Sequence, residues 1–486
     1  MNVVATPQIP TTPAGPELIA ALRALLGEKG LLTGVEDMRP FLTDWRGQLT
    51  GSAVAVARPS STEEVAGLVR LCAAAGVAIV PQGGNTGLMG GATPYAHHAG
   101  IVVSMGRMNR VIEVDPLGYT MTVESGCVLQ TLQELAAHHD RLLPLSLGAQ
   151  GSCTIGGNLS TNAGGAQVLH YGNTRGFVLG LEVVLPSGEV WDGLKALKKD
   201  NTGYDLKHLF IGAEGTLGII TKAVIKVWPK PKDVATAWIC IRDPQAAVEL
   251  LSEAHTASEN SVTSCELMNR TNLDGVFRHV PGCVDPLPAG ESPYFLLMEW
   301  SSALPKAGVM AGRMEEFLGA AMERGLVLDA VIAQSEGQAK AMWHIRESHA
   351  EAGRHDGPGA SYDISVASSR IPAFIEDASR AVRAVLADVR PGPMGHMGDG
   401  NLHFNFKAPI GMSAEQWRQY KPAVTRAVND LLRDYGGSIS AEHGIGSEKV
   451  GELAHYADPV KMATMRAIKR ALDPQNLMNP GKIFEV

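Results

Sequence analysis

Paired cysteines, long apolar runs and an excess of basic residues are all missing from this 486-residue sequence. No two of the six cysteines form a C-x-x-C pair, which removes support for an iron–sulfur cluster or a zinc ribbon. No stretch approaches the ~18 consecutive apolar residues that a transmembrane helix requires. The net charge of −8, without long runs of one sign, argues against a nucleic-acid surface.

The same absences bear on the location of the protein. Isolated cysteines in a long chain are typical of reduced, buried thiols in a cytosolic protein. The stretch from Met1 to Pro16 lacks the charged and apolar parts of a signal peptide, and its prolines favour a short flexible or extended tail. We therefore predict a soluble, cytoplasmic protein with no nucleic-acid partner and no transmembrane segment.

Glycine, in contrast, is abundant, and the excess needs a local explanation. The chain has 54 glycines, about 11% of its residues against a usual share of roughly 7%. A collagen period is absent, and a hydrophobic content of 45% excludes general disorder. Aromatic residues make up only 5%. The length suffices for large buried cores in roughly two to four domains.

Strand and helix patterns alternate in the first part of the chain. An apolar run at Ala53–Ala57 precedes a helix start at Ser61, where Glu64 completes the capping pattern. The next apolar run, Val77–Val80, closes a predicted β-α-β unit. Further strands are predicted at Gly100–Ser104, Met121–Glu124, Leu181–Leu185 and Leu217–Val227.

A domain boundary is predicted at Trp228–Lys232, because two prolines there stop a strand. Beyond it, strand runs alternate with long amphipathic helices, which is typical of an α+β domain. The predicted strands are Thr236–Ile241, Tyr294–Met298, Leu326–Ile332, Tyr362–Val366 and Ser438–Ser440. The predicted helices run from Ser335 toward Gly353, from Ser413 to Gly436 with a disturbance at Pro422, and over Val460–Leu472.

Much of the glycine lies in three segments near predicted strand ends: Pro81–Gly91, Gly148–Gly165 and Gly212–Gly218. Consecutive glycines let backbone N–H groups converge on an anion, and Thr86 adds a hydroxyl. None of the segments is a P-loop or a Rossmann fingerprint. One such loop alone could be a mobile surface loop. Three together predict an extended cofactor that carries phosphate.

A second signal is a pair of histidines that flank a turn. Asp399-Gly400 is typical of a hairpin, which would bring His396 and His403 together across two strands. Glu442-His443-Gly444 adds a carboxylate and a third imidazole. Such groups suit a divalent metal. The alternative is a set of hydrogen-bonded structural histidines, and the spacing is not that of a zincin protease.

The loop P-x-G-G-x-T-G-L-x-G-G, the segment Gly148–Gly165 and the motif at Gly212–Thr221 resemble the FAD-binding domain of vanillyl-alcohol-oxidase-type flavoproteins. The similarity is nearest to the D-lactate, glycolate and D-2-hydroxyglutarate dehydrogenase branch, and it runs from about Asp44 to the C-terminus. The implied fold is α+β. It has a two-subdomain FAD-binding domain over 18–228, an inserted ferredoxin-like substrate domain over 229–435, and a C-terminal segment, 436–486, that returns to the FAD domain.

This resemblance also implies which residues bind FAD. Family members with covalent flavin carry a histidine in the first loop; this loop has none, so non-covalent FAD is expected. The residues implied to contact FAD are Pro81, Gly83, Gly84, Asn85, Thr86, Gly87, Gly151, Ser152, Gly156, Gly157, Asn158, Thr161, Asn162, Gly164, Gly218, Ile220 and Asn479.

For the chemistry, the resemblance implies a divalent metal, usually zinc, bound by His396, His403 and Glu442, with His443 as the base. Asn405 and Arg346 match positions that contact substrate. Two alternatives stay open: His443 could support a metal ligand, and Arg346 could form an exposed helix ion pair.

Two positions depart from the relatives. Ser361 stands where a lysine is usual, and Ala350 where hydroxyglutarate-type members have threonine. Both changes remove polar groups from the expected substrate site. His344, His349 or a cation from elsewhere could compensate.

The predicted function is an FAD- and metal-dependent dehydrogenase that oxidises a D-2-hydroxy acid to the 2-oxo acid by hydride transfer to flavin N5. D-2-hydroxyglutarate, D-malate, D-lactate and a more apolar analogue are the candidate substrates. An electron-transfer flavoprotein, a quinone or a cytochrome would accept the electrons, and a homodimer is one expected assembly. The alternatives are a flavin oxidase that uses oxygen, a non-flavin zinc hydrolase, and a non-enzymatic flavin subunit, which should lack the histidines.

Overall fold

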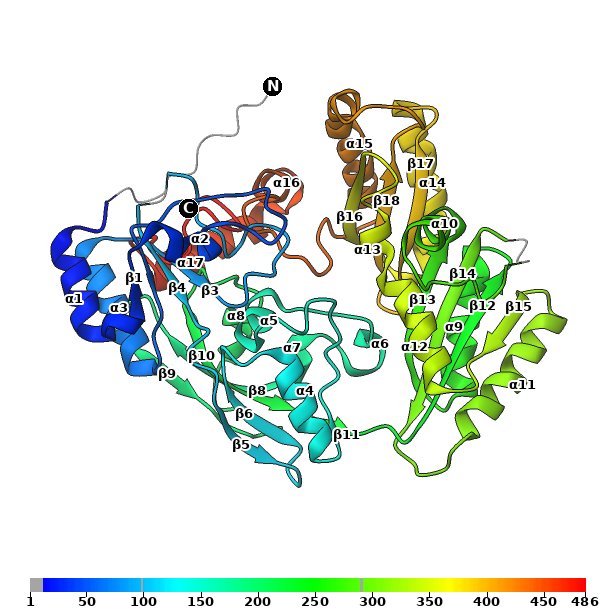
Figure 1. Cartoon of the computed structure of the whole chain (residues 1–486), viewed down its shortest axis with the longest axis horizontal. Coiled ribbons are helices and arrows are strands. Elements are labelled where there is room, and N and C mark those ends of the chain that lie inside the picture. Colours follow the sequence, from blue (N-terminus) through cyan, green and yellow to red (C-terminus); the bar gives the residue numbers. More distant parts are fainter. Residues whose placement is uncertain (1–11, 98, 289–291) are drawn as a thin grey trace. The chain divides into compact units, whose positions relative to one another are not determined.

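The computed structural model describes residues 12–97, 99–288 and 292–486, and the chain divides into two compact units. The first unit comprises Met1–Gly165, Gly172–Pro229 and Glu442–Val486, and the second comprises Ala166–Tyr171 and Lys230–Ala441. Figure 1 shows both units coloured along the sequence. Most of the predicted N-terminal tail lies outside the described residues, and Pro16 already begins α1 (Pro16–Leu26).

The first unit begins with a four-stranded sheet. Ser61 caps α3 (Thr62–Ala75) by accepting a hydrogen bond from the Glu64 amide, and Gly76 ends the helix in a left-handed conformation. This helix joins two strands of the parallel part of the sheet, so the predicted β-α-β unit is confirmed. In spatial order the strands are β1 (Leu31–Leu32), β2 (Ala55–Ala57), β4 (Ile101–Ser104) and β3 (Ile79–Gln82).

A five-stranded antiparallel sheet completes the strands of the first unit, together with the short pair β7 (Arg141–Leu142) and β11 (Trp228–Pro229). Its helices include α4 (Leu129–His138) and α5 (Ile155–Thr161), and the chain ends with α16 (Val450–Tyr456) and α17 (Pro459–Leu472). The five strands in spatial order are β5 (Val111–Asp115), β6 (Thr120–Glu124), β10 (Ile219–Lys226), β8 (Val178–Val184) and β9 (Val190–Gly193).

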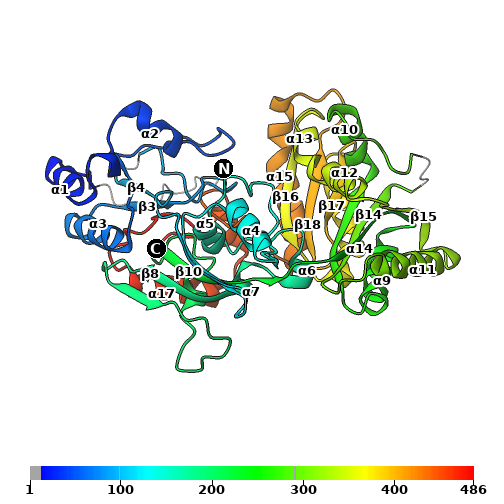
Figure 2. The same ribbon diagram turned by 60° about the horizontal axis from the view of Figure 1, so that its bottom comes forward.

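The second unit is built on a seven-stranded antiparallel sheet with helices on both faces. Figure 2 shows α9 (Pro244–Ala257), α11 (Val309–Glu323) and α14 (Ile371–Val385) on one face, and α10 (Arg270–His279), α12 (Glu336–Glu347) and α13 (His349–Ala352) on the other. The strands in spatial order are β15 (Val327–Ile332), β12 (Asp233–Ile241), β14 (Tyr294–Ser302), β13 (Val262–Asn269), β17 (Arg390–His396), β18 (Asn401–Lys407) and β16 (Gly359–Ser365).

Side chains alternate between the two faces of this sheet. On β14, Met298 and Trp300 join the large core under α9, α11 and α14, whereas Leu297 joins a smaller core under α10 and α12. By the same alternation Glu299 lies on the smaller-core face, and so does Glu266 of β13, which sits between two large-core residues. This face is therefore the one with buried polar groups.

Three predictions about local structure need correction. The helix that begins after Ser335 is interrupted at Ser348, which separates α12 from α13. The helix α15 (Ala414–Asp434) continues through Pro422, because that proline is exposed and water can bind the carbonyl it leaves unpaired. Ser438–Ser440 is not a strand; only an isolated bridge joins Ser438 to Ser365. Within the described ranges, no helix is long and apolar enough to cross a membrane.

Candidate cofactor, metal and substrate sites

The first two glycine-rich segments lie in direct contact within the first unit. A side-chain carbon built on Gly84 would come within 2.2 Å of the Ser152 carbonyl oxygen, and one on Gly83 within 2.5 Å of the Thr154 hydroxyl. Real Cβ atoms do not approach that closely, so only glycine allows the two backbones to pack together here. The third segment joins them, since Gly91 and Glu214 are also neighbours.

The C-terminal segment links these loops through hydrogen bonds from Asn479 and Lys482. The Asn479 amide donates to the carbonyls of Gly91 (2.9 Å) and Glu214 (2.7 Å), and thus links the first and third segments. The buried Lys482 ammonium donates to the Gly90 and Thr93 carbonyls at 2.7 and 2.8 Å. Burial lowers the pKa of Lys482 to about 7. Sequence reasoning did not assign a role to Lys482, although it ends the N-P-G-K motif.

Several buried oxygens near these loops have no hydrogen-bond partner among the described protein atoms. They are Ser125 Oγ, Thr154 Oγ1, Asn158 Oδ1 and Asn479 Oδ1. A buried polar atom is normally paired, so a polar ligand would restore the missing bonds. FAD offers such groups, and two of the four residues, Asn158 and Asn479, are among those implied to contact it. These residues fit FAD.

All of the predicted FAD contacts lie in the first unit. Pro81 is in β3, and Asn85, in the loop that follows it, has a left-handed backbone. Gly156, Gly157, Asn158 and Thr161 are in α5, and Asn162 caps its C-terminus. Ile220 lies at the start of β10, and Gly218 directly precedes that strand. The remaining positions, Gly83, Gly84, Thr86, Gly87, Gly151, Ser152 and Gly164, are in the connecting turns.

Glu214 connects the third glycine-rich segment to the residues that follow His443. Its carboxylate accepts hydrogen bonds from the Ile445 and Gly446 amides, both at 2.8 Å. Burial raises the pKa of Glu214, and these two hydrogen bonds oppose the rise. Sequence reasoning missed this contact, because the two segments are more than 200 residues apart.

The histidine pair lies on the hairpin that Asp399-Gly400 was predicted to form. β17 pairs with β18 in antiparallel register, with His396 opposite Asn401 and Met394 opposite His403. The His396 and His403 ring centroids are 5.3 Å apart, edge to face. Gly400 has the left-handed backbone that such a turn requires.

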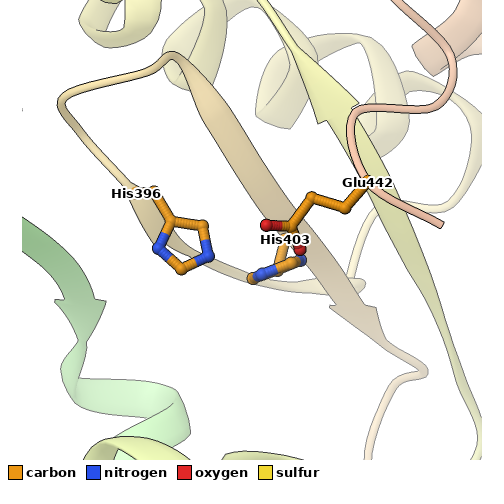
Figure 3. A group of neighbouring side chains, drawn as sticks. All are labelled: His396, His403 and Glu442. Atoms are coloured by element: carbon orange, nitrogen blue, oxygen red, sulfur yellow. The ribbon is translucent and has the colours of Figure 1, made fainter. Parts of the chain in front are cut away.

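Glu442 follows directly after Ala441, the last residue of the second unit. One ligand atom from each of His396, His403 and Glu442 lies within 4.8 Å of the others. Figure 3 shows these three side chains as neighbours. Asp363, Glu442 and His443 form a second group of the same kind. Two imidazoles and a carboxylate are a donor set that suits zinc and similar cations, so these residues fit a divalent metal.

Arg346 of α12 is not in an exposed ion pair, so that alternative is wrong. Its side chain is 15% exposed, and its Nε and Nη2 donate to Oε2 of the buried Glu266 at 2.8 and 2.7 Å. His396 Nδ1 lies 2.6 Å from the other oxygen of the same carboxylate. Burial raises the pKa of Glu266, but Arg346 and His396 lower it more, to about 2. Sequence reasoning missed Glu266; an acidic residue inside an apolar run was its only signal.

Asn405 lies two residues after His403 on β18, so both side chains are on one face of the sheet. Ser361 is the direct partner of Asn405 on β16. Lys407 continues the row and donates to the Gly353 carbonyl. Nearby, His349 cannot supply a cation at neutral pH, because burial lowers its pKa to about 4.

Comparisons with known proteins cover nearly the whole chain. A family model for an FAD binding domain matches residues 53–193, and a model for the C-terminal domain of FAD linked oxidases matches residues 230–483. A mitochondrial D-2-hydroxyglutarate dehydrogenase of Arabidopsis thaliana is 38% identical and covers 96% of this chain and 81% of that protein. A D-2-hydroxyglutarate dehydrogenase of Xanthomonas citri pv. viticola is 36% identical, with coverage of 96% and 97%.

Solved structures share the fold at lower identity. p-Cresol methylhydroxylase with substrate bound gives a TM-score of 0.74 at 18% identity, and covers 96% of each chain. Alkyldihydroxyacetonephosphate synthase gives 0.71 at 19% identity, with coverage of 98% of this chain and 86% of the other. These likenesses support the predicted fold: an FAD-binding domain followed by a second, mixed helix-and-sheet domain.

The prediction of a cytoplasmic location is wrong. The relatives from Arabidopsis thaliana, Danio rerio and Bos taurus are mitochondrial proteins by name, and the bacterial relatives carry no such label. The prediction failed because buried, isolated cysteines and a lack of long apolar runs indicate only a reducing compartment. They do not distinguish one such compartment from another.

Proposed function

The chain belongs to the family of FAD-linked oxidases and is an FAD-dependent oxidoreductase, and from this premise we propose that it oxidises a D-2-hydroxy acid to the 2-oxo acid with the help of a divalent metal. Membership confirms the resemblance to vanillyl-alcohol-oxidase-type flavoproteins. It also makes a non-flavin zinc hydrolase the wrong class, and the relatives named as dehydrogenases support an enzyme over a non-enzymatic subunit. The convergence of His396, His403 and Glu442 is the observation that supports the metal and the hydroxy acid.

The proposed roles follow from donor chemistry. When bound, FAD supplies the two-electron acceptor, and a divalent cation held by His396, His403 and Glu442 lowers the pKa of a hydroxyl. His443, adjacent to Glu442 in the chain, removes the hydroxyl proton. The remaining N–H groups of Arg346 and the amide of Asn405 bind the substrate carboxylate.

The FAD contacts proposed are those implied by the sequence, with Gly83, Gly84, Asn158 and Asn479 central to them. Electrons pass to an electron-transfer flavoprotein, a quinone or a cytochrome rather than to oxygen. The substrate-binding domain is proposed to begin at residue 229, directly after the boundary near Trp228. The proposed assembly is a homodimer.

Anaerobic reduction of the bound flavin tests this proposal. We expect at least one D-2-hydroxy acid to bleach the yellow protein without oxygen, and its L-enantiomer to be at least tenfold slower. A panel with D-2-hydroxyglutarate, D-malate, D-lactate and longer apolar acids, followed by stopped-flow absorbance, measures this. Failure of every acid to reduce a fully loaded flavin would sink the proposal, and rapid reoxidation by air would favour the oxidase alternative.

Metal removal should abolish the same reaction. After chelation and verification of metal loss by mass spectrometry, we expect less than about 1% of the reduction rate, because the hydroxyl loses its polarising cation. Addition of Zn²⁺, Mn²⁺ or Co²⁺ should restore the rate. Full activity of verified metal-free protein would defeat the metal assignment and leave the flavin assignment intact.

Substrate choice is proposed to depend on Ser361. The relatives named D-2-hydroxyglutarate dehydrogenase act on a dicarboxylate, whereas Ser361 offers no charge beside Asn405. We expect Ser361→Lys to raise kcat/KM for D-2-hydroxyglutarate by about tenfold, because a charge-assisted hydrogen bond contributes roughly that much. Ser361→Met is the control of similar length without charge. An equal gain with D-lactate would show that the lysine does not bind the second carboxylate.

A further inference from the structure

Glu266 lies between His396 and Arg346, and it has no role in the chemistry proposed above. It is fully buried on β13, and its Cα partner on β17 is His396. The two residues therefore face each other across the sheet on the same side. One carboxylate oxygen lies 2.6 Å from His396 Nδ1, and the other accepts from Arg346 at 2.7 and 2.8 Å.

The first consequence concerns the tautomer of His396. An ionised carboxylate can only accept hydrogen bonds, so His396 Nδ1 must carry the proton in a contact of 2.6 Å. The lone pair of the neutral ring is then on Nε2, the nitrogen that remains for a metal. Histidines that bind metals commonly donate their other N–H to a carboxylate, which fixes the ring and raises its basicity.

The second consequence concerns Arg346. Its Nη2 lies 3.5 Å from His396 Nε2, so a guanidinium stands directly beside the nitrogen that would face a cation. The Nε and Nη2 of this guanidinium both donate hydrogen bonds to Glu266. The two bonds fix the orientation of the guanidinium, and the carboxylate compensates its positive charge. Without that carboxylate, Arg346 and a bound cation would repel each other at short range.

We propose that Glu266 is a positioning residue that orients a metal ligand and a substrate-binding arginine at the same time. It holds His396 as the Nδ1–H tautomer, with the lone pair on Nε2, and it holds Arg346 beside that nitrogen. This inference rests on the proposed metal-dependent function. It assigns Glu266 a role in metal affinity and carboxylate binding, beyond the stability of the sheet.

The test compares Glu266→Gln with Glu299→Gln. Glu299 lies on the same face of the neighbouring strand and contacts the same helix, through the indole N–H of Trp343 at 2.8 Å. Its other hydrogen bonds come from the hydroxyls of Thr236 and Thr263. The side-chain amide introduced by Glu266→Gln has only one acceptor oxygen, so its NH₂ group must face either His396 or Arg346. Both of those residues already direct a donor N–H at this position. We expect Glu266→Gln to weaken Co²⁺ binding by about 10- to 100-fold. Glu299→Gln should stay within about threefold of the wild type.

Co²⁺ affinity is measured by competition with a chromophoric chelator, and the visible spectrum of the Co²⁺ protein reports the ligand geometry independently of turnover. We expect that spectrum to change in Glu266→Gln alone. At saturating metal, KM for the hydroxy acid should rise through the loss of Arg346 orientation. Equal Co²⁺ affinity and spectra in the two variants would overturn the proposal. A wild type that binds no Co²⁺ would instead refute the metal-dependent function.

A measurement on the wild-type chain tests the proposal even if Glu266→Gln does not fold. In metal-free protein with ¹⁵N-labelled histidine, His396 should give the nitrogen shifts of an Nδ1–H tautomer, with the signal assigned by its absence from His396→Asn. The opposite tautomer would overturn the proposal, because Glu266 would then not be the acceptor of that proton.

Discussion

Replacement of His443 by asparagine is expected to slow anaerobic flavin reduction by at least about 100-fold, because a general base contributes roughly two to four decades. The change keeps a polar side chain of similar reach and removes the group that accepts the hydroxyl proton. His443 stands directly after Glu442, whose carboxylate accepts a hydrogen bond from the Gly165 amide at 3.0 Å, and the amides just beyond His443 donate to Glu214. The backbone that carries His443 is therefore anchored on both sides, so the variant should fold normally.

The measurement is single-turnover stopped flow with D-2-hydroxy acid, at equal FAD and metal content. His455→Asn on α16 is the matched control, since it makes the same change on the C-terminal segment outside the proposed site. Its rate should match the wild type. In His443→Asn the residual rate should rise with pH, as solvent base takes over the proton. A near-wild-type rate would assign His443 to support of the metal ligands, the alternative role left open by the sequence.

Gly84→Ala should yield a protein that retains little or no FAD and unfolds at a lower temperature. The added methyl would lie 2.2 Å from the Ser152 carbonyl oxygen and 2.9 Å from the Cys153 Cα, and both neighbours are backbone atoms. The first two glycine-rich segments would have to separate, with the loss of the buried contact between them. Overpacking of this kind costs about 1–3 kcal/mol or more.

Gly148→Ala is the control, in the second glycine-rich segment and outside the proposed FAD contacts, because a Cβ there meets no atom within 4 Å. We expect it to bind FAD within about threefold of the wild-type affinity. The absorbance ratio at 450 and 280 nm of the purified proteins and their thermal unfolding midpoints measure both effects. Full FAD occupancy in Gly84→Ala would show that this close approach is not needed to form the cofactor site.

The sequence by itself determined the local features of this protein. The helix after Ser61 and the hairpin at Asp399-Gly400 follow from capping and turn residues that act over a few positions. The glycine-rich segments, taken with the C-terminal motif at Asn479, indicated an FAD domain of the correct family. Such patterns are readable because each one depends on neighbours in the chain.

Only the tertiary structure decided which distant residues act together. β13 was not predicted, yet it brings Glu266 opposite His396, 130 residues away, and gives Arg346 a buried partner. Glu214 meets Ile445 and Gly446 in the same long-range way. A buried carboxylate is stable only where donors converge on it, and strand pairing places those donors. The chain order cannot show that convergence, because it arises only when the strands pair.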